Sequence, residues 1–109
     1  MFIGGFSQGC SIAIATSLTH SGGPLGGVIG LSGIHCSQID WTKVDLQNIK
    51  QTPYLLYNGE KDTLIPSMTA ELSFKELCDK ELNLTYISEP ELEHSYSSAE
   101  FDAIKEFMD

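Results

Sequence analysis

The first 39 residues of this chain contain no Asp, Glu, Lys or Arg, and every formally charged side chain lies from Asp40 onward. Charged residues collect at surface positions, so a segment this long without them is expected to lie deep in a sheet-and-helix core, covered on more than one side. A chain of 109 residues makes one domain, and a small domain buries a smaller fraction of its surface. We therefore expect part of that cover to come from a missing N-terminal half or from a partner chain.

The overall charge and the cysteines exclude several classes of function. The formal net charge is −9 at pH 7, whereas general affinity for nucleic acid or an anionic membrane requires a basic face. No positively charged n-region marks a secretory signal, and Gly, Ser and Thr interrupt every apolar stretch before it could span a bilayer. The three cysteines (Cys10, Cys36 and Cys78) show no metal-type pairing, which favours reduced thiols in a cytoplasmic protein without a metal site.

Apolar runs and helical patterns alternate along the chain. Such alternation predicts βαβ units, and therefore an α/β fold with a mostly parallel sheet and helices on both of its faces. The expected strands are Met1–Phe6, Val28–Ser32, Pro53–Tyr57 and Leu84–Ser88. The expected helices are Ser11–Leu18, Met68–Lys80 and Ser97–Met108.

The patterns within these elements predict which residues face the core. The first helix has small and aliphatic residues all round and is expected to be buried. Ser37–Thr52 is polar and irregular, and is expected to form a loop or short helical turns. No internal repeat or linker divides residues 1–109, which predicts a single domain. The residues expected to face inward are Leu72, Phe74 and Leu77 in the second helix, and Phe101, Ile104, Phe107 and Met108 in the last.

A G-x-S-x-G pentapeptide, Gly5–Gly9, joins the first strand to the first helix. A nucleophile elbow needs a sharp strand-to-helix turn that exposes the serine hydroxyl, with Gly5 and Gly9 leaving room for the two arms to approach. The turn would place Ser7 and the backbone amide of Gln8 at a helix N-terminus, where developing negative charge is stabilised. The alternative is a glycine-rich βα turn with an incidental serine. We interpret Ser7 as a nucleophile because a strand leads directly in and a small-residue helix leads directly out.

A serine nucleophile needs a histidine base and a carboxylate that orients it. In folds with this elbow the acid and then the histidine follow the serine, each in a loop after a later strand. Asp62 and His94 fit that order, whereas His20 and His35 precede the acid. Two alternatives stay open: Asp62 could cap the helix that follows it, and a single loop histidine is often only a surface residue.

With these residues in place, the sequence resembles the acyl-protein thioesterase and carboxylesterase/lysophospholipase family of α/β-hydrolases. The likeness covers the whole chain but only the C-terminal half of the family's domain. It implies that Ser7 is the nucleophile, that His94 is the general base and then acid, and that Asp62 is the orienting carboxylate. The amide of Gln8 would be one oxyanion-hole donor. The stretches that carry the resemblance are Gly4–Gly9 (GGFSQG), Leu31–Gly33 (LSG), Asn58–Pro66 (NGEKDTLIP) and Glu93–Ser95 (EHS).

Several positions depart from the family pattern. Cys10 stands where a second glycine is usual, and Asn58 and Thr63 stand where histidine and proline are common in the acid loop. The family's other oxyanion donor comes from a His-Gly loop that would precede residue 1. Loss of one such donor typically lowers turnover by about 10²–10³-fold. Residues 1–109 are therefore expected to be one partial α/β-hydrolase domain that lacks its N-terminal strands and oxyanion loop.

The resemblance implies hydrolysis of carboxylic esters or acyl thioesters through an acyl-enzyme, without metal or organic cofactor. The implied substrates are acylated proteins, lysophospholipids or small esters, with transient contact to a membrane surface through a lipid substrate. A peptidase or lactone hydrolase on the same fold is a related alternative. An alternative of another class is a catalytically inactive remnant that serves as a structural or partner-binding piece.

Overall fold

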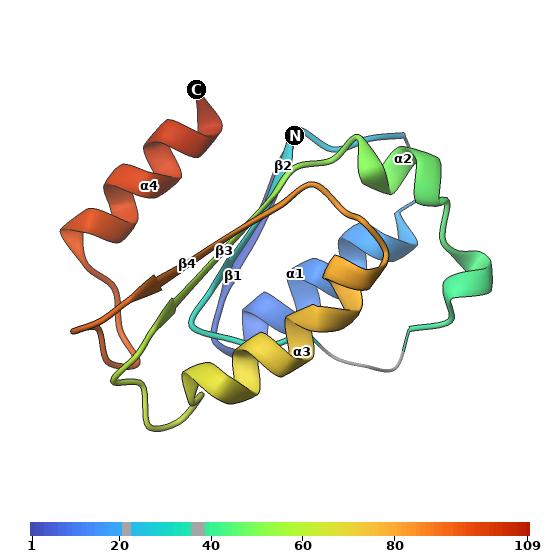
Figure 1. The fold of residues 1–109 in the computed structure, drawn as a ribbon. Helices are drawn as coiled ribbons and strands as arrows, with labels where there is room; N and C mark the ends of the chain where they lie inside the picture. The colour runs from blue at the N-terminus through green and yellow to red at the C-terminus, as the bar shows by residue number, and fades with distance from the viewer. Residues whose placement is uncertain (21–22, 36–38) are drawn as a thin grey trace.

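Four parallel strands form the centre of the structure, a computed structural model that describes residues 1–20, 23–35 and 39–109. The strands lie side by side in the order of the sequence (Figure 1). In this register Phe6, the last residue of the first strand, pairs with Leu31, the last of the second. All carboxyl ends therefore meet at one edge of the sheet. The strands are β1 (Phe2–Phe6), β2 (Gly27–Leu31), β3 (Tyr54–Gly59) and β4 (Leu84–Glu89).

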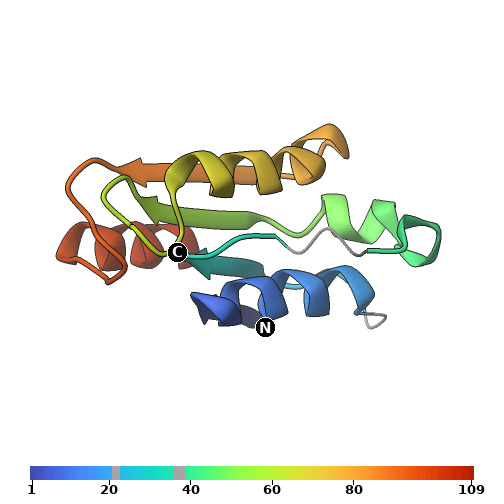
Figure 2. The same cartoon turned by 90° about the horizontal axis from the view of Figure 1, so that it is seen from below.

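Helices cover both faces of this sheet. Helices α1 (Gln8–Thr19) and α3 (Ser67–Asp79) lie on one face, in front of the strands in Figure 2, and α4 (Ser98–Met108) lies on the other (Figures 1 and 2). The predicted α/β class with a parallel sheet is confirmed. The polar stretch before β3 contains a short 3₁₀-helix, η1 (Trp41–Lys43), and α2 (Leu46–Lys50). The side chains of Asp40 and Asp45 cap the N-termini of these two short helices.

The element boundaries differ from the predicted ones mainly at the functional ends of the strands. Helix α1 begins at Gln8, immediately after the elbow serine, rather than at Ser11. Strand β3 continues through Asn58 and Gly59, which were expected to belong to its exit loop. The longer β3 is explained by its pairing with β4, in which Asn58 and Gly59 lie opposite Ser88 and Glu89. Residues 36–38, which include Cys36 and the start of the expected polar loop, lie outside the described residues.

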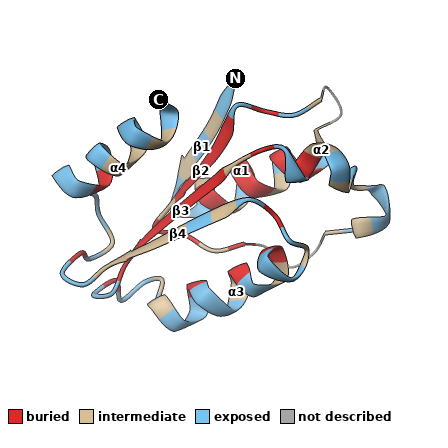
Figure 3. Ribbon diagram, turned by 45° about the horizontal axis from the view of Figure 1, so that its top comes forward, coloured by how far each residue is buried: buried red, intermediate tan, exposed pale blue. Residues whose placement is uncertain are grey.

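The main hydrophobic core lies between the sheet and helices α1 and α3. Strands β2 and β3 are buried along most of their lengths, as Figure 3 shows in red. Cys10 is completely buried on α1, and a Cβ at Gly30 or Gly33 would come within 2.6 Å of its side chain. The thiol thus occupies space that these two glycines leave open. Close packing between helix and strand is retained without a glycine at position 10.

The charge-free N-terminal segment is not covered on every side within this chain. Strand β1 is at the edge of the sheet, and its residues alternate between exposed and half-buried. Phe2 is 40% exposed, Phe6 38% and Ile12 60%. Within the described chain α1 packs on one face of β1 and no strand lies beyond its free edge. This chain therefore does not itself supply the cover on more than one side that the absence of charge predicts.

Three residues that were predicted to face inward are exposed. Leu72 is 68% exposed, because Ala70, Phe74 and Leu77 form the buried stripe of α3 and Leu72 lies on another side of that helix. Phe101 is 55% exposed on α4. Met108 is 48% exposed at the end of the same helix, so both predictions for α4 are wrong, whereas Ile104 and Phe107 are half-buried.

Candidate active site

The turn between β1 and α1 holds Ser7 in a backbone conformation that is rare for residues other than glycine. Its φ is 59° and its ψ is −119°. The Ser7 N–H donates to the carbonyl of Leu31 at 2.7 Å, and the Ser7 carbonyl accepts from the N–H of Cys10 at 3.0 Å. The Ser7 hydroxyl makes no capping bond to the helix, although it stands at the N-cap position. These two backbone hydrogen bonds maintain the strained conformation of Ser7, and its hydroxyl stays available to another partner.

Only one of the two elbow glycines is required by the geometry of this turn. A Cβ at Gly5 would lie 2.0 Å from the carbonyl oxygen of Gly9, a backbone atom that cannot move away cheaply. A Cβ at Gly9 would meet nothing within 4 Å among the described residues. The close approach of the two arms was predicted for both glycines. In this structure Gly5 provides the space and Gly9 provides the backbone that fills it.

Ser7, His94 and Asp62 lie in a hydrogen-bonded chain at the carboxyl edge of the sheet. The Nε2 of His94 is 2.9 Å from the Ser7 Oγ, and its Nδ1 is 2.7 Å from the Asp62 Oδ2. The serine precedes the histidine by 87 residues and the acid precedes it by 32, so the fold alone brings them together. With Nδ1 as the donor to Asp62, the Nε2 lone pair faces the serine hydroxyl and can accept its proton.

Asp62 is held rigidly in the loop after β3. Its side chain has no exposed area, and its Oδ1 accepts hydrogen bonds from the N–H groups of Leu64 at 2.9 Å and Ile65 at 2.8 Å. These bonds leave Oδ2 for His94. The alternative interpretation, a turn residue that caps the following helix, is met only in part: Oδ1 does bond these two N–H groups of the turn, but the N-cap of α3 is Pro66.

His94 lies between this buried carboxylate and solvent. Its side chain is 18% exposed. The ring of Phe6 lies against it with a centroid distance of 5.1 Å, and Ser95 next to it has its carbonyl bonded by the Ser32 hydroxyl at 3.3 Å. Phe6 and Ser32 are site neighbours that sequence reasoning missed. In the sequence, the only indication of their role was position: Phe6 directly precedes Ser7, and Ser32 directly follows β2.

The backbone amide of Gln8 is suited to stabilise an anion beside Ser7. Gln8 is the first residue of α1, so its N–H has no carbonyl one turn earlier in the helix to bond. The helix macrodipole adds partial positive charge at this end. The site therefore offers one backbone donor to an oxygen that becomes negatively charged next to the serine.

The other two histidines take no part in this chain of hydrogen bonds. His20 is the C-cap of α1, at the opposite end of that helix from Ser7. His35 is 3% exposed, and its Nε2 lies 3.7 Å from a carboxylate oxygen of Glu76. Burial lowers the pKa of His35, and Glu76 opposes that effect. The choice of His94 over His20 and His35, made from their order in the sequence, agrees with these positions.

The acid loop and the histidine loop are joined through their backbones. Leu92 accepts a hydrogen bond from the N–H of Lys61 at 3.0 Å, and Glu89 accepts one from the N–H of Glu60 at 2.8 Å. A Cβ at Gly59 would lie 2.0 Å from the Leu92 carbonyl oxygen. This contact requires glycine at position 59, and it fixes the distance between the loops that carry Asp62 and His94.

A buried carboxyl group lies directly behind the histidine loop, on α4. Glu100 has no exposed surface, and neither of its carboxylate oxygens makes a hydrogen bond of ordinary geometry with a described residue. Burial raises its pKa to about 7, while the nearby backbone of Ser97 lowers it and Glu89 raises it further. The sequence signal for its position was the S-x-x-E pattern of Ser97 and Glu100, which marks helix N-termini.

This pKa predicts a specific dependence of stability on pH. Because the pKa of Glu100 is raised in the folded protein from 4.5 to about 7, folding binds a proton that the unfolded chain releases between these values. Stability should therefore fall as the pH rises from about 4.5 to 7, and Glu100→Gln should remove this loss. We expect the variant to be more stable at pH 8 by at most about 3 kcal/mol, at about 1.4 kcal/mol per pKa unit, and to match the wild type near pH 5.

Urea unfolding of both proteins from pH 5 to pH 8 measures this effect. Glu106→Gln, an exposed change on the same helix, is the matched control and should shift stability little at any pH. A difference between Glu100→Gln and the wild type that does not change with pH would contradict the assignment.

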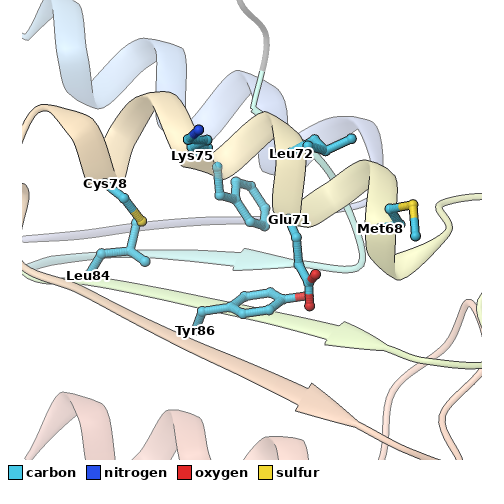
Figure 4. A pocket seen from close by; sticks show the side chains of 8 residues that line it. Met68, Glu71, Leu72, Lys75, Cys78, Leu84 and Tyr86 are labelled. Atoms are coloured by element: carbon cyan, nitrogen blue, oxygen red, sulfur yellow. The ribbon is translucent and has the colours of Figure 1, made fainter.

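An apolar groove of about 370 Å³ lies away from the catalytic edge, between α3 and β4 (Figure 4). Met68, Leu72 and Cys78 line it from the helix, and Leu84 and Tyr86 line it from the strand. It contains none of the three hydrogen-bonded site residues. Its size alone therefore does not identify it as the place of chemistry.

Two further structural findings concern metals and membranes. Within residues 1–20, 23–35 and 39–109, no group of three or more His, Cys, Asp or Glu side chains is arranged to hold a metal ion. In the same part of the chain, every helix is too short or too polar to cross a bilayer.

Comparisons with known proteins agree on one family. The sequence matches the phospholipase/carboxylesterase family over residues 1–109. It is 30% identical to acyl-protein thioesterase 1 of Gibberella zeae, over 97% of this chain and 46% of that protein. It is 31% identical to acyl-protein thioesterase 1 homolog 1 of Dictyostelium discoideum, over 99% of this chain and 47% of that protein. The chain spans about half the length of these curated relatives.

Solved structures share the fold. A variant of Arabidopsis thaliana SOBER1 superimposes with a TM-score of 0.86 at 25% identity, covering 98% of this chain and 50% of that one. Zea mays acyl-protein thioesterase 2 gives a TM-score of 0.84 at 21% identity, covering 96% of this chain and 53% of that one. At 21% identity, the similarity to the Zea mays protein shows only that the two chains share a fold.

Proposed function

Because this chain belongs to the phospholipase/carboxylesterase family of α/β-hydrolases, we propose that it hydrolyses carboxylic esters or acyl thioesters with Ser7 as the nucleophile. The observation that carries the proposal is the chain of hydrogen bonds from Ser7 through His94 to Asp62, with distances of 2.9 and 2.7 Å. A serine hydroxyl is a weak nucleophile until a positioned base takes its proton. These three side chains have the geometry that such activation requires.

In the proposed first half-reaction, His94 Nε2 accepts the Ser7 proton as Oγ attacks the substrate carbonyl carbon. Asp62 stabilises the imidazolium that forms and keeps Nδ1 as a donor. The N–H of Gln8 donates to the oxygen that becomes negatively charged. His94 then returns the proton to the leaving alcohol or thiol, and the acyl group stays on Ser7. Water, deprotonated by His94, hydrolyses this acyl-enzyme in the second half-reaction.

The proposed substrates are acylated proteins, lysophospholipids or small esters, in keeping with the names of the relatives and of the family. A lipid substrate would bring the chain into transient contact with a membrane surface. The proposed compartment is the cytoplasm, in which thiols such as those of Cys10 and Cys78 stay reduced. Residues 1–109 are proposed to be a partial domain, with a second oxyanion donor supplied by a further segment or a partner chain.

A fluorophosphonate ester probe, which forms a covalent bond with an activated serine, tests this proposal. We expect it to label the wild-type chain at Ser7 and to leave Ser7→Ala unlabelled. Ser11→Ala is the matched control, because Ser11 lies one turn along α1 and its hydroxyl donates to the carbonyl of Ile34 at 2.6 Å. A folded wild-type sample that reacts no faster than Ser7→Ala would overturn the proposal.

One observation favours a second candidate function, a structural or partner-binding piece without turnover. The exposed apolar side chains of β1 include Phe2 and Phe6 on an edge strand, where another chain could pair. This candidate predicts a stable oligomer or aggregate without ester hydrolysis. Light scattering measures the oligomeric state, and an assay with p-nitrophenyl esters measures turnover. A monomer that hydrolyses these esters would contradict the second candidate.

A further inference from the structure

A cluster of polar side chains closes the base of the loop that carries His94. The loop leaves β4 at Glu89 and enters α4 at Ser97. The Oε1 of Glu89 accepts hydrogen bonds from the Ser97 hydroxyl at 2.7 Å and from the Tyr57 hydroxyl at 2.5 Å. One carboxylate oxygen therefore joins the two ends of the loop to each other and to β3.

The same strand leads to the other half of the site. Tyr57 stands five residues before Asp62, and the backbone bonds of Glu60 and Lys61 to the histidine loop lie between them. Because Tyr57 is only 2% exposed, its hydroxyl is held in one place by the packing of the strand. The Glu89 carboxylate thus takes its position from the buried sheet, and the loop takes its position from Glu89.

The expected protonation states make the Glu89 carboxylate a hydrogen-bond acceptor and the Tyr57 hydroxyl a donor. Hydrogen bonds from Tyr57 and Ser97 lower the pKa of Glu89, so its carboxylate is ionised near neutral pH. Burial, together with the adjacent Glu89, raises the pKa of Tyr57 to about 12, so the tyrosine stays a donor. Hydrogen bonds with one charged partner are shorter and stronger than neutral ones.

We propose that Glu89 is a positioning residue, whose carboxylate holds both ends of the histidine loop against Tyr57 and so sets the distance from His94 to Ser7. The inference rests on the proposed function, since positioning affects catalysis only if His94 is the base. Removal of the carboxylate releases the Ser97 end of the loop from Tyr57, whereas backbone pairing still holds residue 89 and Asp62 still bonds the ring at Nδ1. A displacement of about 1 Å in a reacting group can lower the rate about 10²-fold.

The first test measures the rate of fluorophosphonate labelling at Ser7 in the full chain. We expect Glu89→Ala and Tyr57→Phe each to lower the second-order rate constant by about 10- to 100-fold. The double variant should lose little more than Glu89→Ala alone, because the two changes remove one shared hydrogen bond. Glu89→Gln keeps an oxygen at the Oε1 position and should stay within a few-fold of the wild type. Asp45→Ala, which removes the N-cap of α2 far from this loop, controls for general loss of stability.

The second test does not depend on activity. The chain contains three histidines, so ¹⁵N-histidine spectra can be assigned with His20→Gln and His94→Gln. We expect Glu89→Ala to shift the ring signals of His94 and to leave those of His20 unchanged. Thermal unfolding of each variant shows whether it is folded. If Glu89→Ala does not fold, Tyr57→Phe gives the same comparison.

The outcomes separate this inference from the proposed function. A wild-type chain that is not labelled refutes the proposed function, and the His94 spectra still decide whether Glu89 positions the ring. A folded Glu89→Ala protein that is labelled at the wild-type rate, with unchanged His94 signals, refutes the positioning role and leaves the proposed function intact. Equal losses in Glu89→Gln and Glu89→Ala would refute the geometric explanation in favour of a simple effect of charge.

Discussion

Asp62→Asn is expected to lower the hydrolysis of a p-nitrophenyl ester about 10⁴-fold while leaving the fold intact. Asparagine can keep its oxygen in the place of Oδ1, where the N–H groups of Leu64 and Ile65 donate to it. Its amide NH₂ would then face His94 Nδ1 in place of Oδ2. Because the amide is a donor, Nδ1 must become the acceptor and Nε2 must carry the proton. Nε2 then has no lone pair with which to accept the proton of Ser7.

Initial rates with the p-nitrophenyl ester and thermal unfolding curves measure this effect. Asp45→Asn is the matched control, since it makes the same change of charge at an exposed helix cap and asparagine caps helices well. That control should keep wild-type activity. A loss below about 10-fold in Asp62→Asn would contradict the assigned role, because a correctly oriented base would then not depend on this carboxylate.

Gly5→Ala is expected to prevent stable folding of the elbow. The added methyl carbon would lie 2.0 Å from the carbonyl oxygen of Gly9 and 2.9 Å from the backbone nitrogen of Cys10. Backbone atoms of β1 and α1 would have to separate, although Ser7 is bonded to Leu31 at 2.7 Å and Cys10 is completely buried. We expect the free energy of unfolding to fall by about 3 kcal/mol or more, a large part of the 5–15 kcal/mol of a typical domain.

Urea unfolding followed by circular dichroism measures this loss. Gly9→Ala is the matched control, because a Cβ there meets nothing within 4 Å among the described residues and its φ is not in the left-handed region. It should leave stability unchanged or raise it by up to about 1 kcal/mol, since alanine restricts the unfolded chain. Equal stability of the two variants would show that the elbow relaxes easily.

Much of the site could be predicted because its signals are local in sequence. The strand-to-helix turn around Ser7 requires small residues at fixed spacing, and the parallel sheet brings every strand's carboxyl end to one edge. Asp62 and His94 follow two of these ends, so topology places them near Ser7 without knowledge of side-chain contacts. Their catalytic roles stay a prediction, tested by the variants above.

Other features depended on contacts between distant segments. Leu72 follows a helical pattern that fits the core, yet the crossing of α3 over the sheet turns it toward a surface groove. Glu100 is charged by type, yet its place on the buried side of α4 leaves it no exposed surface. The hydrogen bonds of Glu89 join residues 57, 89 and 97, which no local pattern relates.

The sequence by itself determined the order of strands and helices, the elbow serine and the choice of acid and histidine. These depend on backbone preferences, apolar periodicity and chain order, all of which act within a few residues or follow from parallel topology. The tertiary structure alone decided which side chains are covered, which glycine is required and how the histidine loop is held. Burial and steric contact depend on atoms from other parts of the chain, so these properties exist only once the sheet has assembled.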